Sequence, residues 1–318
     1  MSVPSPPTFR LDVHEPEPDA PGLTWQENMM FNWYDLDRGV AGSHSVRLEM
    51  NHAATIWSGV TTEAGLRYRL NRQGVPIAAH DHTPERHGAG PLAFVGGDAF
   101  GVEHHDDDVD VSLRLDEFYA PVEPWGDGQI DLVQQAAGHL ETAGRVRGTV
   151  RVGDETFEID GLGYRDHSWA QANMALARSH AWVAGTFGPD LSYSGIIYQG
   201  VNGAYMRGGS IVRDGRKILA EAVDIVIYQE CDGISNRGGE IRFHLPGGEV
   251  VEIVAEAFDG FVYEMGPMAI CESMCRGRLT GTDRVGQCHF EGGPAHERTR
   301  PVTQAFRGIV QDGITRRR

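Results

Sequence analysis

The densest group of reactive side chains lies near the middle of the chain, at Arg165-Asp-His-Ser-Trp169. It combines a guanidinium, a carboxyl group, an imidazole, a hydroxyl group and an indole. Histidine titrates closest to neutral pH and can donate or accept a proton there. A carboxyl group in an apolar pocket can also donate a proton, because burial raises its pKa. The segment therefore predicts acid–base chemistry, with His167 and Asp166 as candidate catalytic residues.

A strand across residues 164–169 would place alternate side chains on its two faces. Three of them would share one face, namely Arg165, His167 and Trp169. The other three would share the opposite face, namely Tyr164, Asp166 and Ser168. Only one of these sets can line a lumen. On a lumenal face, an indole can stabilise a developing carbocation and a guanidinium can anchor a substrate oxygen.

Two roles stay open for Asp166 and for the segment as a whole. A carboxylate that faces away from the lumen would hold the backbone or fix the tautomer of a histidine, whereas one that faces inward would act as a neutral acid. The segment can also be a buried polar cluster that closes one part of the fold, with His167 and Trp169 as core residues. Replacing His167 with Ala separates these cases, because a catalytic histidine is needed for turnover but not for folding.

The rest of the chain has the pattern of short antiparallel strands. Apolar and polar residues alternate, as in Val109-Asp-Val-Ser-Leu-Arg-Leu115, and this predicts strands with one buried and one exposed face. The segments with this pattern are 44–51, 66–70, 109–115, 146–152, 156–160, 194–201, 222–228, 240–245 and 250–258. Helical patterns are limited to 133–140 and 171–178. The sequence therefore predicts an all-β fold of sandwiches or barrels.

The composition limits the partners and the compartment. With 28 Lys and Arg against 45 Asp and Glu, the formal net charge is -17, which argues against nucleic acid or an anionic membrane surface as a partner. The sequence has neither an apolar run of about 18 residues for a membrane span nor the basic and apolar regions of a signal peptide. We therefore expect a cytoplasmic protein, with a homodimer as one option for its assembly.

The length of 318 residues favours two domains of roughly 150 residues each. Residues 1–21 contain six of the 16 prolines, so we expect an extended arm outside the core. The four cysteines are too few for a disulfide framework and lack the spacing of zinc knuckles. We expect them to be free thiols, and we expect no metal site.

The segment Asp166-His-Ser-Trp169 resembles the Asp-His-x-Trp signature of the AttH-like and carotenoid 1,2-hydratase (hydroxyneurosporene synthase) superfamily. Trp25-Gln-Glu-Asn-Met-Met-Phe-Asn-Trp-Tyr-Asp35 is similar to the aromatic, acidic opening of AttH-like relatives. The resemblance implies two consecutive lipocalin-like (calycin-type) antiparallel β-barrels with few short helices. The implied divisions are an arm at 1–21, a first barrel at 22–178 that contains the motif, and a second barrel at 179–318.

The same resemblance implies a cofactor-free reaction on a hydrophobic small molecule, such as a terpenoid or an aromatic compound. In the carotenoid hydratases this is acid-initiated addition of water to a double bond, and other relatives resemble cyclases and pericyclases. The resemblance favours His167 and Trp169 as lumenal residues. Further aromatic candidates for substrate binding or for the core are Trp33, Trp57, Trp182, Tyr193 and Tyr198. The chain departs from the family at Ala170, where glycine is usual, and after Tyr193, where an expected aspartate is missing.

Two histidine-rich segments suggest a different chemistry. In His80-Asp-His-Thr-Pro-Glu-Arg-His87, two histidines at i and i+2 follow Gly74 much as at the start of a cupin metal site. Pro84 interrupts the strand pattern, so we expect a solvated loop. Glu103-His-His-Asp-Asp-Asp108 has the charge density of an exposed turn.

The leading hypothesis is a cofactor-independent hydratase, lyase, isomerase or cyclase that acts on a hydrophobic substrate. One alternative is a non-catalytic barrel that carries or senses an apolar ligand. A second alternative is a cupin-like, metal-dependent enzyme. Because the chain lacks GxGxxG, GxxxxGK[ST] and GxSxG motifs, nucleotide cofactors and serine hydrolysis have no sequence support.

Overall fold

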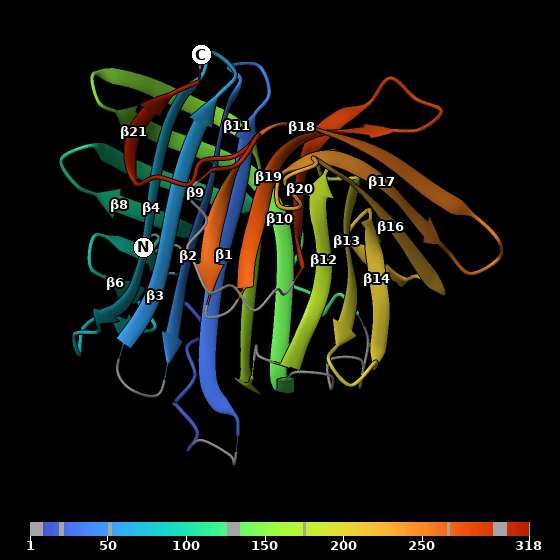
Figure 1. Cartoon of the computed structure of the whole chain (residues 1–318), viewed down its shortest axis with the longest axis horizontal. Coiled ribbons are helices and arrows are strands. Elements are labelled where there is room, and N and C mark those ends of the chain that lie inside the picture. The colour runs from blue at the N-terminus through green and yellow to red at the C-terminus, as the bar shows by residue number, and fades with distance from the viewer. Residues whose placement is uncertain are drawn as a thin grey trace, which may run out of the picture.

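The computed structural model describes residues 9–18, 22–49, 53–125, 134–173, 176–265, 268–294 and 304–317. Every named element in these ranges is a β-strand, and the strands form two antiparallel sheets. Figure 1 shows the two sheets side by side, each curled into a half-barrel. The all-β prediction and the expected double lipocalin-like architecture are therefore confirmed.

The first sheet has 12 strands in the order β21-β4-β3-β2-β1-β11-β10-β9-β8-β7-β6-β5. Their bounds are β1 (Thr24–Asp35), β2 (Val40–Glu49), β3 (Ala53–Thr62), β4 (Leu66–Pro76), β5 (His82–Thr83), β6 (Arg86–Ala89), β7 (Leu92–Val95), β8 (Phe100–His105), β9 (Val109–Glu117), β10 (Gln134–Val152), β11 (Glu155–Ala172) and β21 (Gly313–Arg316). The long strands β1 and β11 pair along Thr24 to Tyr34 at the middle of this sheet.

The second sheet has nine strands in the order β15-β14-β13-β12-β20-β19-β18-β17-β16. Their bounds are β12 (Ala177–Thr186), β13 (Leu191–Gly200), β14 (Tyr205–Arg213), β15 (Arg216–Leu219), β16 (Ala222–Gln229), β17 (Asn236–His244), β18 (Val250–Met265), β19 (Met268–Leu279) and β20 (Val285–Pro294). The chain enters this sheet at Ala177, two residues before the expected second barrel. It returns to the first sheet at β21, which pairs with β4.

Both faces of β1 are buried, because the second sheet packs against the outside of the first. The side chains that enter the core of the first sheet are Trp25, Met29, Phe31 and Trp33. Met30 and Tyr34 instead join a separate core between the sheets, and a third core around Phe243 fills the second sheet. The expected pattern of one buried and one exposed face holds for β9 but not for β1.

Polar and aromatic contacts fasten the two sheets together. Asp259 of β18 accepts two hydrogen bonds of 2.6 Å from the Arg67 guanidinium of β4 and one of 2.9 Å from the Thr61 hydroxyl of β3. Phe261 lies against Gly59 so closely that a Cβ atom there would sit 2.4 Å from its ring. Glycine at position 59 therefore allows the sheets to meet.

The two expected helices are wrong in the parts that the structure describes. Residues 134–140 belong to β10, where they pair with β11, and residues 171–172 and 177–178 belong to β11 and β12. Pairing across a large sheet gives these backbones their hydrogen bonds and overrides a weak helical pattern. Residues 133, 174 and 175 lie outside the described ranges. Within those ranges, no helix is long and apolar enough to cross a membrane.

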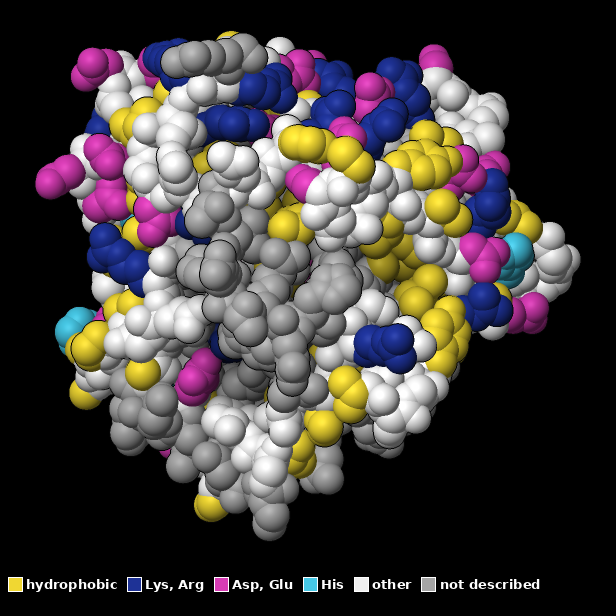
Figure 2. All heavy atoms as spheres, in the orientation of Figure 1, with side chains coloured by type: hydrophobic (Ala, Val, Ile, Leu, Met, Phe, Trp, Pro, Cys, Tyr) yellow, Lys and Arg dark blue, Asp and Glu magenta, His cyan; other side chains and the backbone are white. Residues whose placement is uncertain are grey.

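The N-terminal arm is also more closely packed than its prolines suggested. Phe9 pairs with Gly97 through the backbone, and Leu11 is buried in the core of the first sheet. The expectation of an arm outside the core is therefore wrong for residues 9–14, because their apolar side chains complete the first barrel. Figure 2 shows hydrophobic side chains exposed over the second sheet, and those exposed on its strands include Val226, Tyr228 and Val254.

Candidate functional site

A cleft of about 150 Å³ lies between the two sheets. Three indoles line it, from Trp57 on β3, Trp125 after β9 and Trp182 on β12. The rest of the lining includes the apolar side chains of Met30, Ile196 and Ile270, and carboxyl and imidazole side chains from both sheets. An apolar cavity with a few convergent ionisable groups is a typical small-molecule site.

The group on the first sheet consists of His139 and Glu141 on β10 and Asp166 on β11. His139 and Glu141 are two residues apart and therefore share a face, and Glu141 is paired in register with Asp166. His139 Nε2 lies 2.9 Å from Glu141 Oε1 and 2.5 Å from Asp166 Oδ2. Burial opposes charging of His139, but the two carboxylates outweigh it and raise its pKa to about 10. The His139 imidazole is therefore charged at neutral pH.

Further hydrogen bonds hold Glu141 in place. The Tyr164 hydroxyl donates to its Oε2 at 2.6 Å, and Trp182 Nε1 donates to its Oε1 at 3.2 Å. Burial, followed by the charge of Glu141, raises the pKa of Tyr164 well above its usual value, so this phenol stays a donor. Because Trp182 belongs to the second sheet, its bond to Glu141 joins the two walls of the cleft.

The group on the second sheet contains two carboxyl groups that face each other across a strand pair. Glu272 of β19 is paired in register with Glu291 of β20, and each contacts a histidine. Glu272 contacts His289 of β20, and Glu291 contacts His180 of β12. Burial raises the pKa of Glu272 well above its usual value. Burial acts on Glu291 in the same direction, but His180 outweighs it and lowers the pKa of that carboxyl.

The pKa values of the two carboxyl groups are thus shifted in opposite directions. Burial favours the neutral, protonated form of Glu272, and His180 favours the charged form of Glu291. The charge of Glu291 outweighs burial and raises the pKa of His180, which favours the charged form of this imidazole. Burial lowers the pKa of His289 to about 4, which keeps it neutral. Neighbouring titratable groups with separated pKa values are the usual arrangement of an acid and a base.

The cleft also offers hydrogen-bond donors without acceptors. Among the described residues, Arg47 Nε, Trp57 Nε1 and the Tyr198 hydroxyl are buried and have no hydrogen-bond partner. Leaving such donors unpaired costs free energy that a bound acceptor can recover. A substrate oxygen placed in the cleft would meet these groups.

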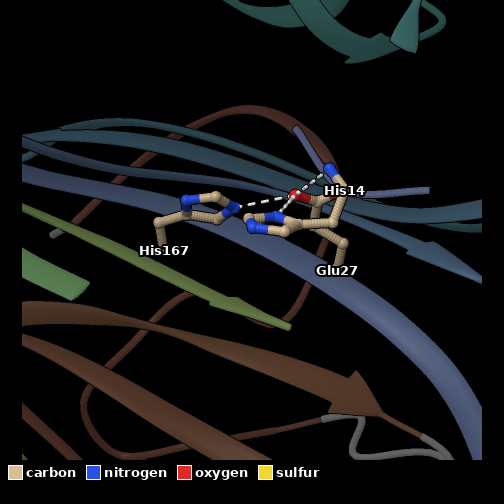
Figure 3. Close-up of side chains that lie close together, drawn as sticks. All are labelled: His14, Glu27 and His167. Carbon is tan, nitrogen blue, oxygen red and sulfur yellow. Dashed lines mark hydrogen bonds and ion pairs between the residues drawn. The ribbon is translucent and has the colours of Figure 1, made fainter. Parts of the chain in front are cut away.

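The opposite face of β11 points into the first barrel and forms a second cluster. His167 Nε2 lies 2.8 Å from Glu27 Oε1, and His14 Nδ1 lies 2.9 Å from the same oxygen (Figure 3). Trp169 stacks on His14 with ring centroids 3.7 Å apart. Burial raises the pKa of Glu27 to about 8 and lowers that of His167 well below its usual value.

Several groups of side chains could hold a metal ion. Within the described residues, four triads of histidine and carboxylate side chains bring their three ligand atoms within 4.8 Å of one another. The triads in the first barrel are His14–Glu27–His167 and Glu27–His82–His87. The triads in the cleft are His139–Glu141–Asp166 and Glu272–His289–Glu291.

The residues predicted from the sequence separate into three places. Those that line the cleft or support its wall are Asp166, Ser168, Trp57, Trp182, Tyr198 and, through Glu141, Tyr164. Those inside the first barrel are Arg165, His167, Trp169 and Trp33. Tyr193 lies in the core of the second sheet. Both faces of β11 are buried, so alternation alone did not reveal which one faces the cleft.

Sequence reasoning missed most of the ionisable cleft residues. Those that line the cleft are His139, His180, Glu272 and Glu291, and two that contact them are Glu141 and His289. A usable signal was present, because His139-Leu-Glu141 and His289-Phe-Glu291 each place a histidine and a carboxylate on one face of a strand. The first pair was hidden by the expectation of a helix, and the second by attention to the preceding Cys288.

The histidine-rich segments are not the solvated loops that we expected. His80 is exposed, but His87 is fully buried and His82 is partly buried beside Glu27. His104 is also fully buried and hydrogen-bonds the Ser58 hydroxyl at 2.8 Å. Cys271 and Cys275 of β19 and Cys288 of β20 are buried free thiols.

Structural neighbours share this architecture at low sequence identity. A candidate AttH protein from Nitrosomonas europaea has a TM-score of 0.61 and 10% identity, over 87% of this chain and 94% of that one. CghA, in a structure with Sch210972, has a TM-score of 0.62 and 13% identity, over 86% and 89%. Kievitone hydratase from Nectria haematococca has a TM-score of 0.60 and 11% identity, also over 86% and 89%.

These neighbours establish the fold as the AttH and carotenoid-hydratase type of double barrel, which confirms the resemblance inferred from the motif. No curated protein gives a significant match to the sequence. A family model described as "Domain of unknown function (DUF7064)" matches residues 12–294, which include the cleft groups and nearly all strands of both sheets. The chain therefore belongs to the DUF7064 family.

Proposed function

We propose that this protein is a cofactor-independent enzyme that uses the cleft between its sheets for acid–base conversion of an apolar small molecule. The reaction classes that fit are hydration or dehydration of a double bond, isomerisation and cyclisation. The observation that carries the proposal is the pair Glu272 and Glu291, two neighbouring buried carboxyl groups beside an indole-lined cavity, whose pKa values are shifted in opposite directions.

Glu272 is the proposed proton donor. It is 1% exposed and contacts the neutral His289, so it keeps its proton at a pH at which an ordinary glutamate has lost it. Transfer of this proton to an alkene carbon leaves a carbocation on the substrate and a carboxylate on Glu272. Water then adds to the cation and loses a proton to a carboxylate, which gives hydration. Loss of a proton from a neighbouring carbon to the Glu272 carboxylate gives isomerisation instead and restores the acid.

The surroundings of the cleft suit a cationic intermediate. Indole faces attract cations, and Trp57, Trp125 and Trp182 all line the cavity. The carboxyl groups of Glu141 and Asp166, with His139 between them, also favour positive charge that develops in the cleft. Because these groups are already fixed by hydrogen bonds, they need little reorganisation when charge develops.

Substrate orientation would come from the unpaired donors. Arg47, Trp57 and Tyr198 can bind a carbonyl, hydroxyl or ether oxygen of an otherwise apolar molecule. Two neighbours fit this picture by name, since one is a kievitone hydratase and the other, CghA, was solved with Sch210972. Asp166 stays in the proposal as part of the cleft wall, whereas His167 has no direct role in it.

The test is a search for turnover with a matched pair of variants. Purified protein in D₂O is incubated with unsaturated terpenoids and aromatic compounds, and products are detected by mass spectrometry as hydrated species or as isomers carrying deuterium. Glu272→Gln keeps the shape of the side chain but holds no transferable proton, so turnover should fall at least about 100-fold. Glu256→Gln, at an exposed position on the adjacent strand β18, is the control.

Equal turnover in Glu272→Gln and Glu256→Gln would refute the assignment of the acid. Tight binding of a compound in the cleft without any conversion would favour the carrier or sensor alternative. His167→Ala is measured in the same experiment. If this variant loses turnover while its folding and metal content stay unchanged, the catalytic site lies in the first barrel instead of the cleft.

A further inference from the structure

The interior of the first barrel gathers five metal-ligating side chains from five separate segments. Glu27 of β1 lies at the centre and is 0% exposed. The imidazoles around it come from the N-terminal arm, β5, β6 and β11, and belong to His14, His82, His87 and His167. The cleft chemistry proposed above uses none of these residues.

The donor atoms converge on the Glu27 carboxylate. His14 Nδ1 and His167 Nε2 lie 2.9 and 2.8 Å from Oε1. The His82 ring lies beside the other oxygen, with Nε2 3.5 Å from Oε2. Its Nε2 donates to the His14 carbonyl oxygen at 3.0 Å, so the lone pair is on Nδ1, which is buried without a partner among the described residues. His82 and His87 are directly opposite each other in the β5–β6 pair, so one hairpin supplies two donors. Ligands of a tetrahedral zinc ion, each about 2.0–2.1 Å from the metal, lie about 3.3 Å apart. Both triads, with atoms within 4.8 Å, are close to that spacing.

The partners of Glu27 are those of a metal ligand. Among the described residues, its ion-pair partners are all histidines, namely His14, His82 and His167. Imidazole nitrogens grouped around one carboxylate are the donor set of zinc sites.

His87 has a free lone pair that points to a ligand. Its Nε2 lies 3.2 Å from the Val46 carbonyl oxygen, which can only accept, so Nε2 carries the proton of the neutral ring. Nδ1 therefore presents its lone pair, and it is buried without a hydrogen-bond partner among the described residues. Histidine ligands of metals usually donate their second ring nitrogen to a carbonyl or carboxylate in this way.

We propose that Glu27 and the histidines of its two triads, His14 with His167 and His82 with His87, form a site for one divalent transition-metal ion, with zinc as the best chemical match. Imidazole and carboxylate donors suit zinc and its first-row neighbours, not calcium or magnesium. The site is structural, because Glu27, His87 and His167 are buried and Trp169 covers His14. The ion fastens the arm and the β5–β6 hairpin to the central strands β1 and β11.

The two triads in the cleft are weaker candidates for the ion. Their carboxylates already have cationic partners, because His139 lies between Glu141 and Asp166 and His180 is paired with Glu291. A metal ion there would have to displace a protonated imidazole. In the first barrel, by contrast, His87 Nδ1 is buried without a hydrogen-bond partner among the described residues and is available to an ion.

The test uses tag-free full-length protein that has been stripped with a chelator and then titrated with Zn²⁺ or Co²⁺ alone. We expect one equivalent of metal per chain by elemental analysis, a higher melting temperature with Zn²⁺, and visible absorption bands with Co²⁺. His82→Ala should weaken the affinity at least about tenfold, since loss of even an outer-shell partner has that effect. His80→Ala, with an exposed imidazole two residues away, should bind as wild type does.

A second pair of variants assigns the ion to one site and guards against misfolding. Glu27→Gln preserves the side-chain shape and should fold without metal, yet it should lose both the bound ion and the Zn²⁺-dependent rise in melting temperature. Glu291→Gln, in the cleft, should keep both. Failure of the wild type to bind a stoichiometric ion would overturn the proposal. The proposal would also be overturned if Glu291→Gln lost the ion while Glu27→Gln kept it. An equal loss of affinity in His80→Ala and His82→Ala would overturn it as well.

Discussion

The buried imidazolium of the cleft makes a prediction about stability that does not depend on knowing the substrate. His139 lies between Asp166 and Glu141, and we consider its replacement by Gln. The amide has a similar size and can still donate a hydrogen bond, but it cannot carry a charge. Two neighbouring buried carboxylates would then have no cation between them, which is the costly way to break a buried ion pair.

The size of the effect follows from the two pKa values of His139. Burial works against its charged form, but Asp166 and Glu141 raise the pKa from 6.5 to about 10. The difference, at about 1.36 kcal/mol per pH unit, corresponds to about 5 kcal/mol. Since the folded pKa is the higher one, this stability is fully present below pH 6.5 and is lost as the pH rises towards 10. In that window the wild type should lose about 1.4 kcal/mol per pH unit through this group.

The assay is urea unfolding of wild type and His139→Gln at pH 6.5, 7.5, 8.5 and 9.5. The variant should be less stable by about 3–5 kcal/mol at pH 6.5, and the difference should shrink at each step upward. The control is His105→Gln, which removes an exposed histidine 3.2 Å from Asp110 and should change stability by less than about 1 kcal/mol. Parallel curves for wild type and His139→Gln across this range would refute the charged state assigned to His139.

Three further outcomes follow from the same contacts. Turnover should fall about tenfold per pH unit once the pH exceeds the raised pKa of Glu272, because the donor proton is then lost, and a pH–rate profile checks this. Asp259→Ala should destabilise the protein by about 3–5 kcal/mol in urea unfolding, since it leaves Arg67 unpaired between the sheets. Trp182→Phe should cost about 1–3 kcal/mol, because Glu141 loses a buried donor, and thermal or chemical unfolding measures it.

The fold was predictable because it rests on period-two alternation, which the chain displays clearly. Val109 to Leu115 alternates between buried and exposed side chains, and it forms β9 as predicted. The resemblance of Asp166-His-Ser-Trp169 then identified the double barrel. Residues 134–140 were misassigned to a helix. Their strand conformation depends on pairing with β11, which the pattern within residues 134–140 alone does not reveal.

The site was less predictable, because its residues come from both sheets. Asp166 and Glu272 are far apart in sequence, and only packing of the sheets brings both to the cleft. The strongest single motif was also ambiguous, since β11 is buried on both sides. The assumption that one face of a strand is exposed to solvent fails for such a strand, because one face lines the cleft and the other lines the first barrel.

This two-sided burial changes how loss of function should be interpreted. Asp166 lines the cleft while His167 binds Glu27 inside the first barrel, so one backbone separates two proposed sites. If the metal ion holds β11 in place, His167→Ala should lower turnover indirectly, together with metal content and melting temperature. Asp166→Asn should instead lower turnover while leaving the ion bound. Turnover measured beside metal content therefore distinguishes a residue that acts on the substrate from one that positions the strand.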